Sequence, residues 1–239
     1  AIKLTLTFNS PYKANNIIEF WRRWHITLSR FLKEYLYIPL GGNKNGKFRR
    51  HLNLLITMFL GGLWHGAGYN FIIWGTLHGV YLIINHSWIT INKSVQIIIP
   101  QFISSFLTIF GVIIAWVFFR SETTVGAVKL LKSMFGFNGV QLPVDLFHKL
   151  ENLVPLFNVL GVTGDGIYVL SLGSWAIGIP LIFVIFLFTF ILPNTNDIMK
   201  NYTPTINSDL EIVSKNSCSI YWRPTIGWAL IISFLASIG

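Results

Sequence analysis

Residues 52–65 read LNLLITMFLGGLWH, an apolar stretch that ends in a histidine. Residues 71–91 are again mostly apolar, and no Asp or Glu occurs between Glu34 and Glu122. An ionisable side chain deep in a bilayer costs free energy and by default indicates a functional site. A helix that starts with this stretch would bring His65 about 20 Å along its axis, well within a hydrocarbon core about 30 Å thick. The stretch therefore predicts a membrane-embedded helix and makes His65 the first candidate for chemistry.

The composition of the chain is that of a membrane protein. Hydrophobic residues make up 53% of its 239 residues and charged residues only 11%, whereas a soluble domain carries about 25% charged residues. Ten of the eighteen Lys and Arg lie within the first fifty residues, next to the apolar stretch. This arrangement is typical of a cytoplasmic face that contacts anionic lipid headgroups. A nucleic-acid-binding module would carry such a patch on a soluble body, so nucleic acid is not an expected partner.

We predict an all-α, polytopic transmembrane protein with an amphipathic interfacial helix before the histidine. In residues 16–40 apolar side chains recur every three or four positions, which predicts a helix lying along the membrane surface. Beyond the first apolar tract, three further segments are candidate spans, namely 96–119, 175–192 and 222–238. Residues 152–172 are apolar but interrupted by Pro155 and by a GVTGDG run, which indicates a re-entrant or interfacial segment.

Glycines surround the histidine at the end of the first stretch. A Gly-Gly pair at 61–62 precedes it, and a Gly-Ala-Gly run at 66–68 follows it. Glycine lets backbones approach closely or breaks a helix locally, and irregular backbone at membrane depth is tolerated only where it is buried or lines a cavity. We therefore expect His65 to face a cavity, where a neutral imidazole would act as a general base on a hydroxyl. The alternative is a histidine hydrogen-bonded to a carbonyl between packed helices.

A second histidine, His25, lies in the basic aromatic segment EFWRRWHITLSR of residues 19–30. It would sit at the mouth of the same cavity and orient a substrate or share in proton transfer. The alternative, of equal weight, is an interfacial histidine among aromatic residues. Arg22, Arg23 and Arg30 carry planar guanidinium groups that suit a phosphate or diphosphate, although contact with lipid headgroups explains each of them as well.

The remaining histidines do not have the spacing of a metal site. His78 and His86 are eight residues apart, two helical turns, which is too far for adjacent ligands. No carboxylate lies near them, and the single cysteine, Cys218, is remote in the sequence. Neither a zinc site nor an intrachain disulfide is therefore expected. His78 either lines the cavity near His65 or is hydrogen-bonded in the core.

Three runs of sequence carry a family resemblance: FNSPYKA at residues 8–14, EFWRRWHITLSRFLKEYLYIPLGGN at 19–43 and NLLITMFLGGLWHGAGYNFIIWGTLHG at 53–79. They resemble membrane-bound O-acyltransferases. Within these they are most similar to the bacterial alginate O-acetyltransferase branch, a relative of the D-alanyl transfer protein of teichoic acid. The resemblance covers residues 8–80 nearly without gaps and continues weakly at 116–120 and 192–195. It is specific for the family and not for the acceptor.

The resemblance implies that His65, in the family's Trp-His-Gly motif, is the catalytic residue and that His25 is the second characteristic histidine. It implies a multi-pass protein of the bacterial inner membrane that moves an acetyl or other short acyl group. The donor would be a cytoplasmic thioester, either acyl-coenzyme A or an acyl carrier, with no bound cofactor. The acceptor would be a hydroxyl of an extracytoplasmic polysaccharide or of a secreted esterase-like acyltransferase partner.

Six further residues are candidates for substrate binding: Arg22, Arg23, Arg30, Trp64, Asn70 and His78. Members of the family are longer than this chain, so residues 1–239 would form the C-terminal part of one membrane-embedded domain whose N-terminal helices are missing. The runner-up from another class is a channel or transporter without catalysis, because a glycine-flanked polar residue inside the membrane is also typical of a permeation path. The lack of an acid in the apolar tract for proton coupling argues against it.

Overall fold

The computed structural model describes residues 6–166 and 175–199, together with residues 222, 225–228, 230 and 233. Within these residues the chain is predominantly helical, as predicted. Cys218 and most of the segment 222–238, the last expected span, lie outside the described residues.

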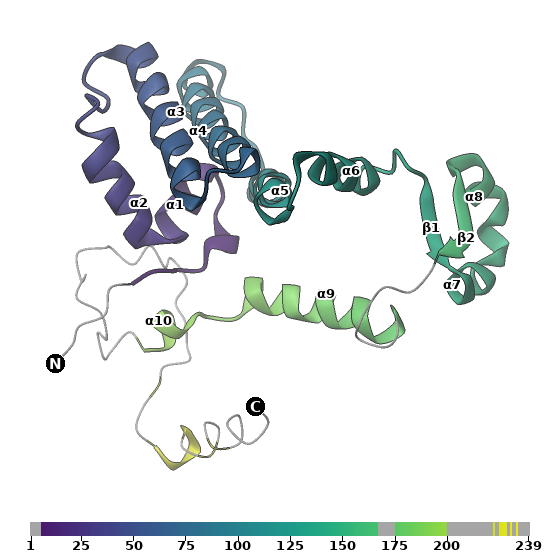
Figure 1. Cartoon of the computed structure of the whole chain (residues 1–239). Coiled ribbons are helices and arrows are strands. Elements are labelled where there is room, and N and C mark those ends of the chain that lie inside the picture. Colours follow the sequence, from purple (N-terminus) through teal and green to yellow (C-terminus); the bar gives the residue numbers. More distant parts are fainter. Residues whose placement is uncertain are drawn as a thin grey trace.

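Two long helices form the centre of the fold, α3 (Gly46–His65) and α4 (Tyr69–Val95). They lie side by side (Figure 1) and are joined by the short turn at residues 66–68. A Cβ built on Gly62 would lie 3.1 Å from the Cα of Gly75 and 2.3 Å from the carbonyl oxygen of Phe71. The Gly-Gly pair therefore does allow two backbones to approach closely, as the sequence predicted.

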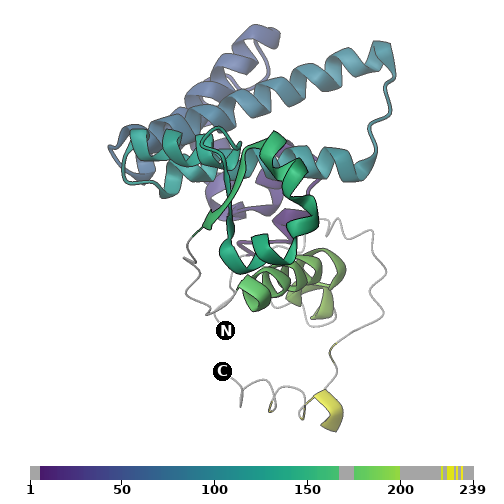
Figure 2. The same ribbon diagram turned by 90° about the vertical axis from the view of Figure 1, so that its right-hand side faces the viewer.

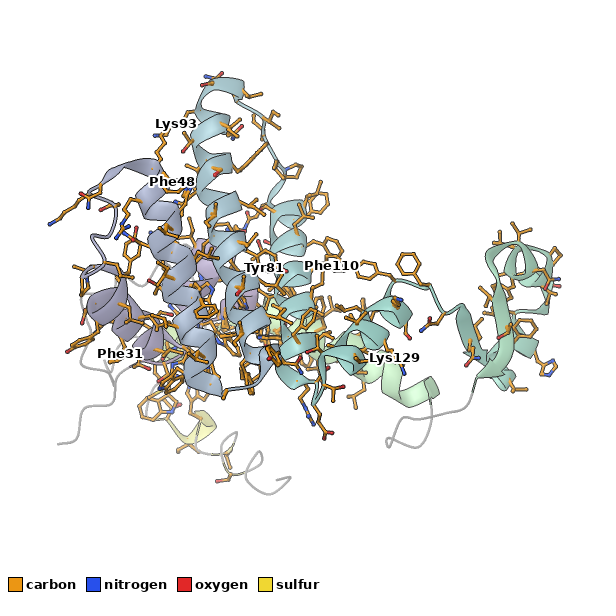
Figure 3. The ribbon with its side chains drawn as sticks, turned by 45° about the horizontal axis from the view of Figure 1, so that its top comes forward. Phe31, Phe48, Tyr81, Lys93, Phe110 and Lys129 are labelled. Carbon is orange, nitrogen blue, oxygen red and sulfur yellow. The ribbon has the colours of Figure 1, made fainter. Side chains whose placement is uncertain are left out.

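The next helix, α5 (Gln101–Arg120), packs against α4, and α6 (Thr124–Met134) follows it. Tyr81 of α4 contacts α5, where a Cβ on Gly111 would be 3.6 Å from its ring. Phe110 points to the other side of α5 (Figure 3), and its ring lies 5.9 Å from that of Phe135. Among the described residues, α5 is the one helix that is both long and apolar enough to cross a membrane. The polytopic arrangement stays a prediction.

The segment 16–40 is not the single helix that its apolar repeat predicted. After the short helix η1 (Pro11–Lys13), the structure has α1 (Ile17–Arg23), α2 (Ile26–Leu32) and the π-helical turn η2 (Lys33–Tyr37). Asn16 caps α1, because its Oδ1 accepts a hydrogen bond of 2.9 Å from the Glu19 backbone. The helix breaks at His25, whose backbone is left-handed with φ 40° and ψ 58°.

The core is an aromatic cluster between the N-terminal helices and α4 and α5. Phe20 and His78 are completely buried, and their rings stack with centroids 6.3 Å apart and 9° between the planes. Trp24 extends this stack on the other side of Phe20, at a centroid distance of 5.7 Å. Trp116 of α5 in turn lies 5.1 Å from Trp24. Burial of such large rings fixes α1 against α4 and α5.

A small unit with two short strands follows α6. Its elements are β1 (Val140–Pro143), α7 (Val144–Lys149), η3 (Glu151–Leu153), α8 (Val154–Leu160) and β2 (Val162–Gly166). The two strands are parallel, with Val140 opposite Val162, and Figure 2 shows them in front with α7 and α8 beside them. Gly139 and Gly161 precede the strands with φ of 77° and 66°, a conformation that favours glycine. These turns end the neighbouring helices and start extended chain. Residues 167–172 of the expected re-entrant or interfacial segment lie outside the described residues, and its relation to the membrane stays a prediction.

The last described helices are α9 (Trp175–Ile191), which matches the expected span 175–192, and the short α10 (Thr195–Ile198). All side chains from Leu181 to Phe188 are exposed in the isolated chain. A helix that is apolar all round requires lipid or further protein around it. At its end α10 returns to the N-terminal segment of the chain (Figure 1).

Candidate active site

His65 is the last residue of α3 and lies half-buried among aromatic rings. The ring centroids of Trp74 and Phe119 are each 5.1 Å from that of His65, and both meet it edge-on. Phe71 lies 6.4 Å away on another side. The next residue, Gly66, has no space for a side chain, because a Cβ there would lie 2.7 Å from the Phe71 ring. The Trp-His-Gly run thus ends the helix and packs the imidazole against rings of α4 and α5.

His25 occupies the break between α1 and α2. Its Nδ1 accepts a hydrogen bond of 3.3 Å from the backbone N–H of Leu28, so the side chain caps the start of α2. The hydroxyl of Thr27 lies 3.2 Å from the same nitrogen. Because Nδ1 serves as an acceptor, the neutral imidazole carries its proton on Nε2. His25 therefore presents a hydrogen-bond donor on its free side.

Forty positions of sequence separate His25 and His65. Their rings are close enough for a charge on His25 to act on His65. Two cavities of about 1150 and 630 Å³ lie among the described residues, and neither is lined by His25 or His65. That His65 faces a cavity stays a prediction.

The three predicted arginines differ in their surroundings. Arg23 forms an ion pair with Glu19, with its Nη2 2.7 Å and its Nε 3.0 Å from Glu19 Oε1. A further bond of 3.3 Å joins its Nη1 to the carbonyl oxygen of Asn9. Arg22 and Arg30 are exposed. Arg23 is thus held inside the fold, whereas Arg22 and Arg30 reach the surface, where an anionic ligand has access to them.

Arg22 belongs to a basic cluster that was not predicted from the sequence. Arg22, Arg50 and His51 are all close enough to His86 for their charges to act on it, and Arg50 Nη2 lies 3.3 Å from His51 Nε2. Burial raises the pKa of the nearby Tyr37, and the Arg50 guanidinium acts in the opposite direction. The basic residues at the start of α3 were the signal in the sequence for this cluster. Their proximity to Arg22 of α1 and His86 of α4 depends on the tertiary fold.

The other three predicted substrate contacts lie in different environments. Trp64 is 66% exposed, and its ring meets that of His65 edge-on at a centroid distance of 4.9 Å. Asn70 is buried, and both ends of its amide are hydrogen-bonded: Nδ2 donates to the Ser121 carbonyl at 2.6 Å, and Oδ1 accepts from the Thr124 hydroxyl at 2.8 Å. His78 is completely buried and accepts a bond from Trp21. For Asn70 and His78 this geometry favours a structural role, which is the alternative that the sequence left open for His78.

Residues 4–124 match the sequence profile of the MBOAT family, the membrane-bound O-acyltransferases. The chain belongs to this family. The matched region contains both candidate histidines, α3, α4 and α5. Among the described residues, no group of three or more His, Cys, Asp or Glu has the arrangement of a metal site.

Curated relatives extend this assignment. The peptidoglycan O-acetyltransferase of Helicobacter pylori is 51% identical over 141 residues, which are 59% of this chain and 27% of that protein. The probable alginate O-acetylase AlgI of Pseudomonas aeruginosa is 46% identical over 136 residues, 56% of this chain and 25% of that protein. The teichoic acid D-alanyltransferase of Streptococcus thermophilus is 33% identical over 102 residues, 40% of this chain and 25% of that protein. The matched segment thus spans about a quarter of the length of these relatives.

Proposed function

We propose that the protein acts as an O-acyltransferase of the bacterial inner membrane. It transfers an acetyl or other short acyl group from a cytoplasmic thioester to a hydroxyl of an extracytoplasmic polysaccharide or of a secreted partner protein. The observation that carries this proposal is the family match over residues 4–124, which includes His25 and His65. It is supported by the fold, in which His25 is near enough for its charge to act on His65. Family membership also favours catalysis over a channel or transporter.

The proposed chemistry is one acyl transfer. The acceptor oxygen attacks the thioester carbonyl carbon while His65 takes the hydroxyl proton as general base. The carbon–sulfur bond then breaks, and the thiolate leaves as a thiol when it receives that proton. Such general-base assistance is typically worth about 10²–10⁴-fold in rate. The Nε2 proton of His25 is suited to donate a hydrogen bond to the acyl oxygen or to an incoming substrate.

The donor and the acceptor are proposed from chemistry and from the relatives. Coenzyme A and the prosthetic arm of an acyl carrier both contain phosphate groups, for which the exposed Arg22 and Arg30 are suitable partners. Arg23 would act on the donor only indirectly, since it is paired with Glu19. The names of the relatives include transfer to peptidoglycan and to alginate, which supports a polysaccharide acceptor. They also include D-alanyl transfer, so the transferred group is proposed to be either acetyl or another short acyl group such as D-alanyl.

The test of the proposal is a His65→Ala substitution in the full-length membrane protein. Ester-linked acyl groups on the surface polymer are released with mild base and quantified in a deletion strain complemented with each variant. We expect His65→Ala to lower transfer by about 10²-fold or more at an unchanged protein level in the membrane. The matched control is His148→Ala, because His148 is exposed in α7, outside the family match. Normal acylation with His65→Ala would overturn the proposed role of this residue.

A further inference from the structure

The left-handed backbone at His25 is held on both sides by a segment that precedes α1. The backbone N–H of Asn9 donates to the carbonyl oxygen of Arg23 at 2.9 Å. On the other side of the break, the N–H of Ile26 donates to the carbonyl oxygen of Thr7 at 2.8 Å. A positive φ is uncommon for any residue with a side chain and persists where the surroundings enforce it. Residues 7–10 therefore fix the conformation from which the His25 ring projects.

The same segment contacts the ring of His25 directly. Phe8 lies between the two bracketing hydrogen bonds, and its ring centroid is 6.0 Å from that of His25. It also meets Trp24 edge-on at 5.0 Å. A shift of residues 7–10 would therefore move the backbone of His25 and change the packing of its side chain together.

Residues 7–10 are in turn held by the far end of the chain. The side-chain Nδ2 of Asn194 donates to Oδ1 of Asn9 at 2.9 Å and to the hydroxyl of Ser10 at 2.6 Å. Asn196 adds a bond of 3.3 Å to the carbonyl oxygen of Phe8. The partners are separated by 184 to 188 positions in the sequence. Asn194 is thus connected through Asn9 to the carbonyl oxygen of Arg23, two residues before His25.

The amide of Asn194 has two separable roles. Its Oδ1 accepts the backbone N–H of Asp197 at 2.8 Å, and Asp197 Oδ2 lies 3.3 Å from the Asn194 backbone nitrogen, which together cap α10. Its Nδ2, by contrast, is directed entirely to Asn9 and Ser10. An alternative residue such as serine can supply the cap but is too short to reach Asn9.

From these contacts we propose that Asn194 is a positioning residue for His25 and acts through Asn9. This inference rests on the proposed function, in which His25 takes part in acyl transfer. Reacting groups must be held close to their productive geometry, and a misplacement of about 1 Å can cost about 10²-fold in rate. The end of α9 and the start of α10 would therefore control transfer without contact with a substrate.

The experiment uses the full-length protein with Asn194→Ser, which keeps the helix cap and removes the amide donor. The matched control is Asp197→Ala, which removes one half of the cap and leaves the contacts of the Asn194 amide to Asn9 and Ser10. Each variant is made in the wild-type background and in a His25→Ala background, and the rate of acyl transfer is measured. In parallel, diethyl pyrocarbonate modification of His25 is followed by mass spectrometry of the peptide that contains it.

We expect Asn194→Ser to lower transfer on the order of tenfold in the wild-type background and not at all in the His25→Ala background. Modification of His25 is expected to become faster in Asn194→Ser, and Asp197→Ala should resemble the wild type in both measurements. Equal losses in the two backgrounds, or an unchanged rate of modification, would overturn the positioning role. Full activity of His25→Ala alone would instead overturn the proposed role of His25, and the modification rate would still decide whether Asn194 positions it.

Discussion

The indole Nε1 of Trp21 donates a hydrogen bond of 3.3 Å to Nδ1 of the completely buried His78. This bond joins α1 to the middle of α4 across 57 positions of sequence. It also orients the helix that ends at the break before His25. His78 and the half-buried His65 both contact the ring of Trp74, at centroid distances of 4.9 and 5.1 Å. His78 therefore has a structural role in supporting the candidate site.

The first prediction concerns this bond. Trp21→Phe keeps an aromatic ring in the cluster but leaves Nδ1 of His78 buried without its donor. The unmade bond should lower the free energy of unfolding by about 1–3 kcal/mol, measurable as a lower midpoint of thermal unfolding in detergent. Adding His78→Phe to Trp21→Phe should cost less than the sum of the two single substitutions, because both polar partners are then gone. Strictly additive costs would show that the two residues do not act as a pair.

A second prediction follows from the contact between α3 and α4. A Cβ on Gly75 would lie 2.3 Å from the Met58 carbonyl oxygen and 3.0 Å from the Cα of Gly62. Gly75→Ala should therefore separate the helices, cost about 1–3 kcal/mol of stability and lower transfer by displacing His65. Gly111→Ala is the matched control, since its Cβ would make ordinary contact with Tyr81 at 3.6 Å. A Gly75→Ala protein as stable and active as the control would contradict the assigned packing.

The glycines in the sequence were enough to predict the close approach of α3 and α4. No feature of the sequence, by contrast, indicates the break at His25. The apolar repeat of residues 16–40 continues through Trp24 and His25 without Gly or Pro, so local pattern predicted a single helix. The break is imposed by backbone pairing with residues 7–10, and these are held by Asn194 from the far end of the chain. Contacts at such separation depend on the tertiary fold and cannot be read from periodicity.

The third prediction separates the neighbouring arginines. Arg23 is paired with Glu19 inside the fold, so Arg23→Ala should chiefly lower stability, because it leaves the Glu19 carboxylate part-buried without its partner. Arg22 is exposed, so Arg22→Ala should leave the unfolding midpoint unchanged and raise the KM for a phosphate-bearing thioester donor with little change in kcat. Initial rates over a range of donor concentrations distinguish the two effects. An unchanged KM in Arg22→Ala would remove this residue from the proposed donor site.

The final prediction separates the chemistry of His25 from its structural role. Asparagine tolerates the left-handed conformation and caps helices well, so His25→Asn should preserve the local fold. It cannot exchange a proton near neutral pH, and transfer should fall by about 10²-fold or more if His25 handles a proton. His25→Ala should lose transfer to the same extent and in addition about 1 kcal/mol of stability, because Leu28 loses its cap. If His25→Asn retained wild-type transfer while His25→Ala lost it in proportion to its stability, the second histidine would serve only to shape the turn between α1 and α2.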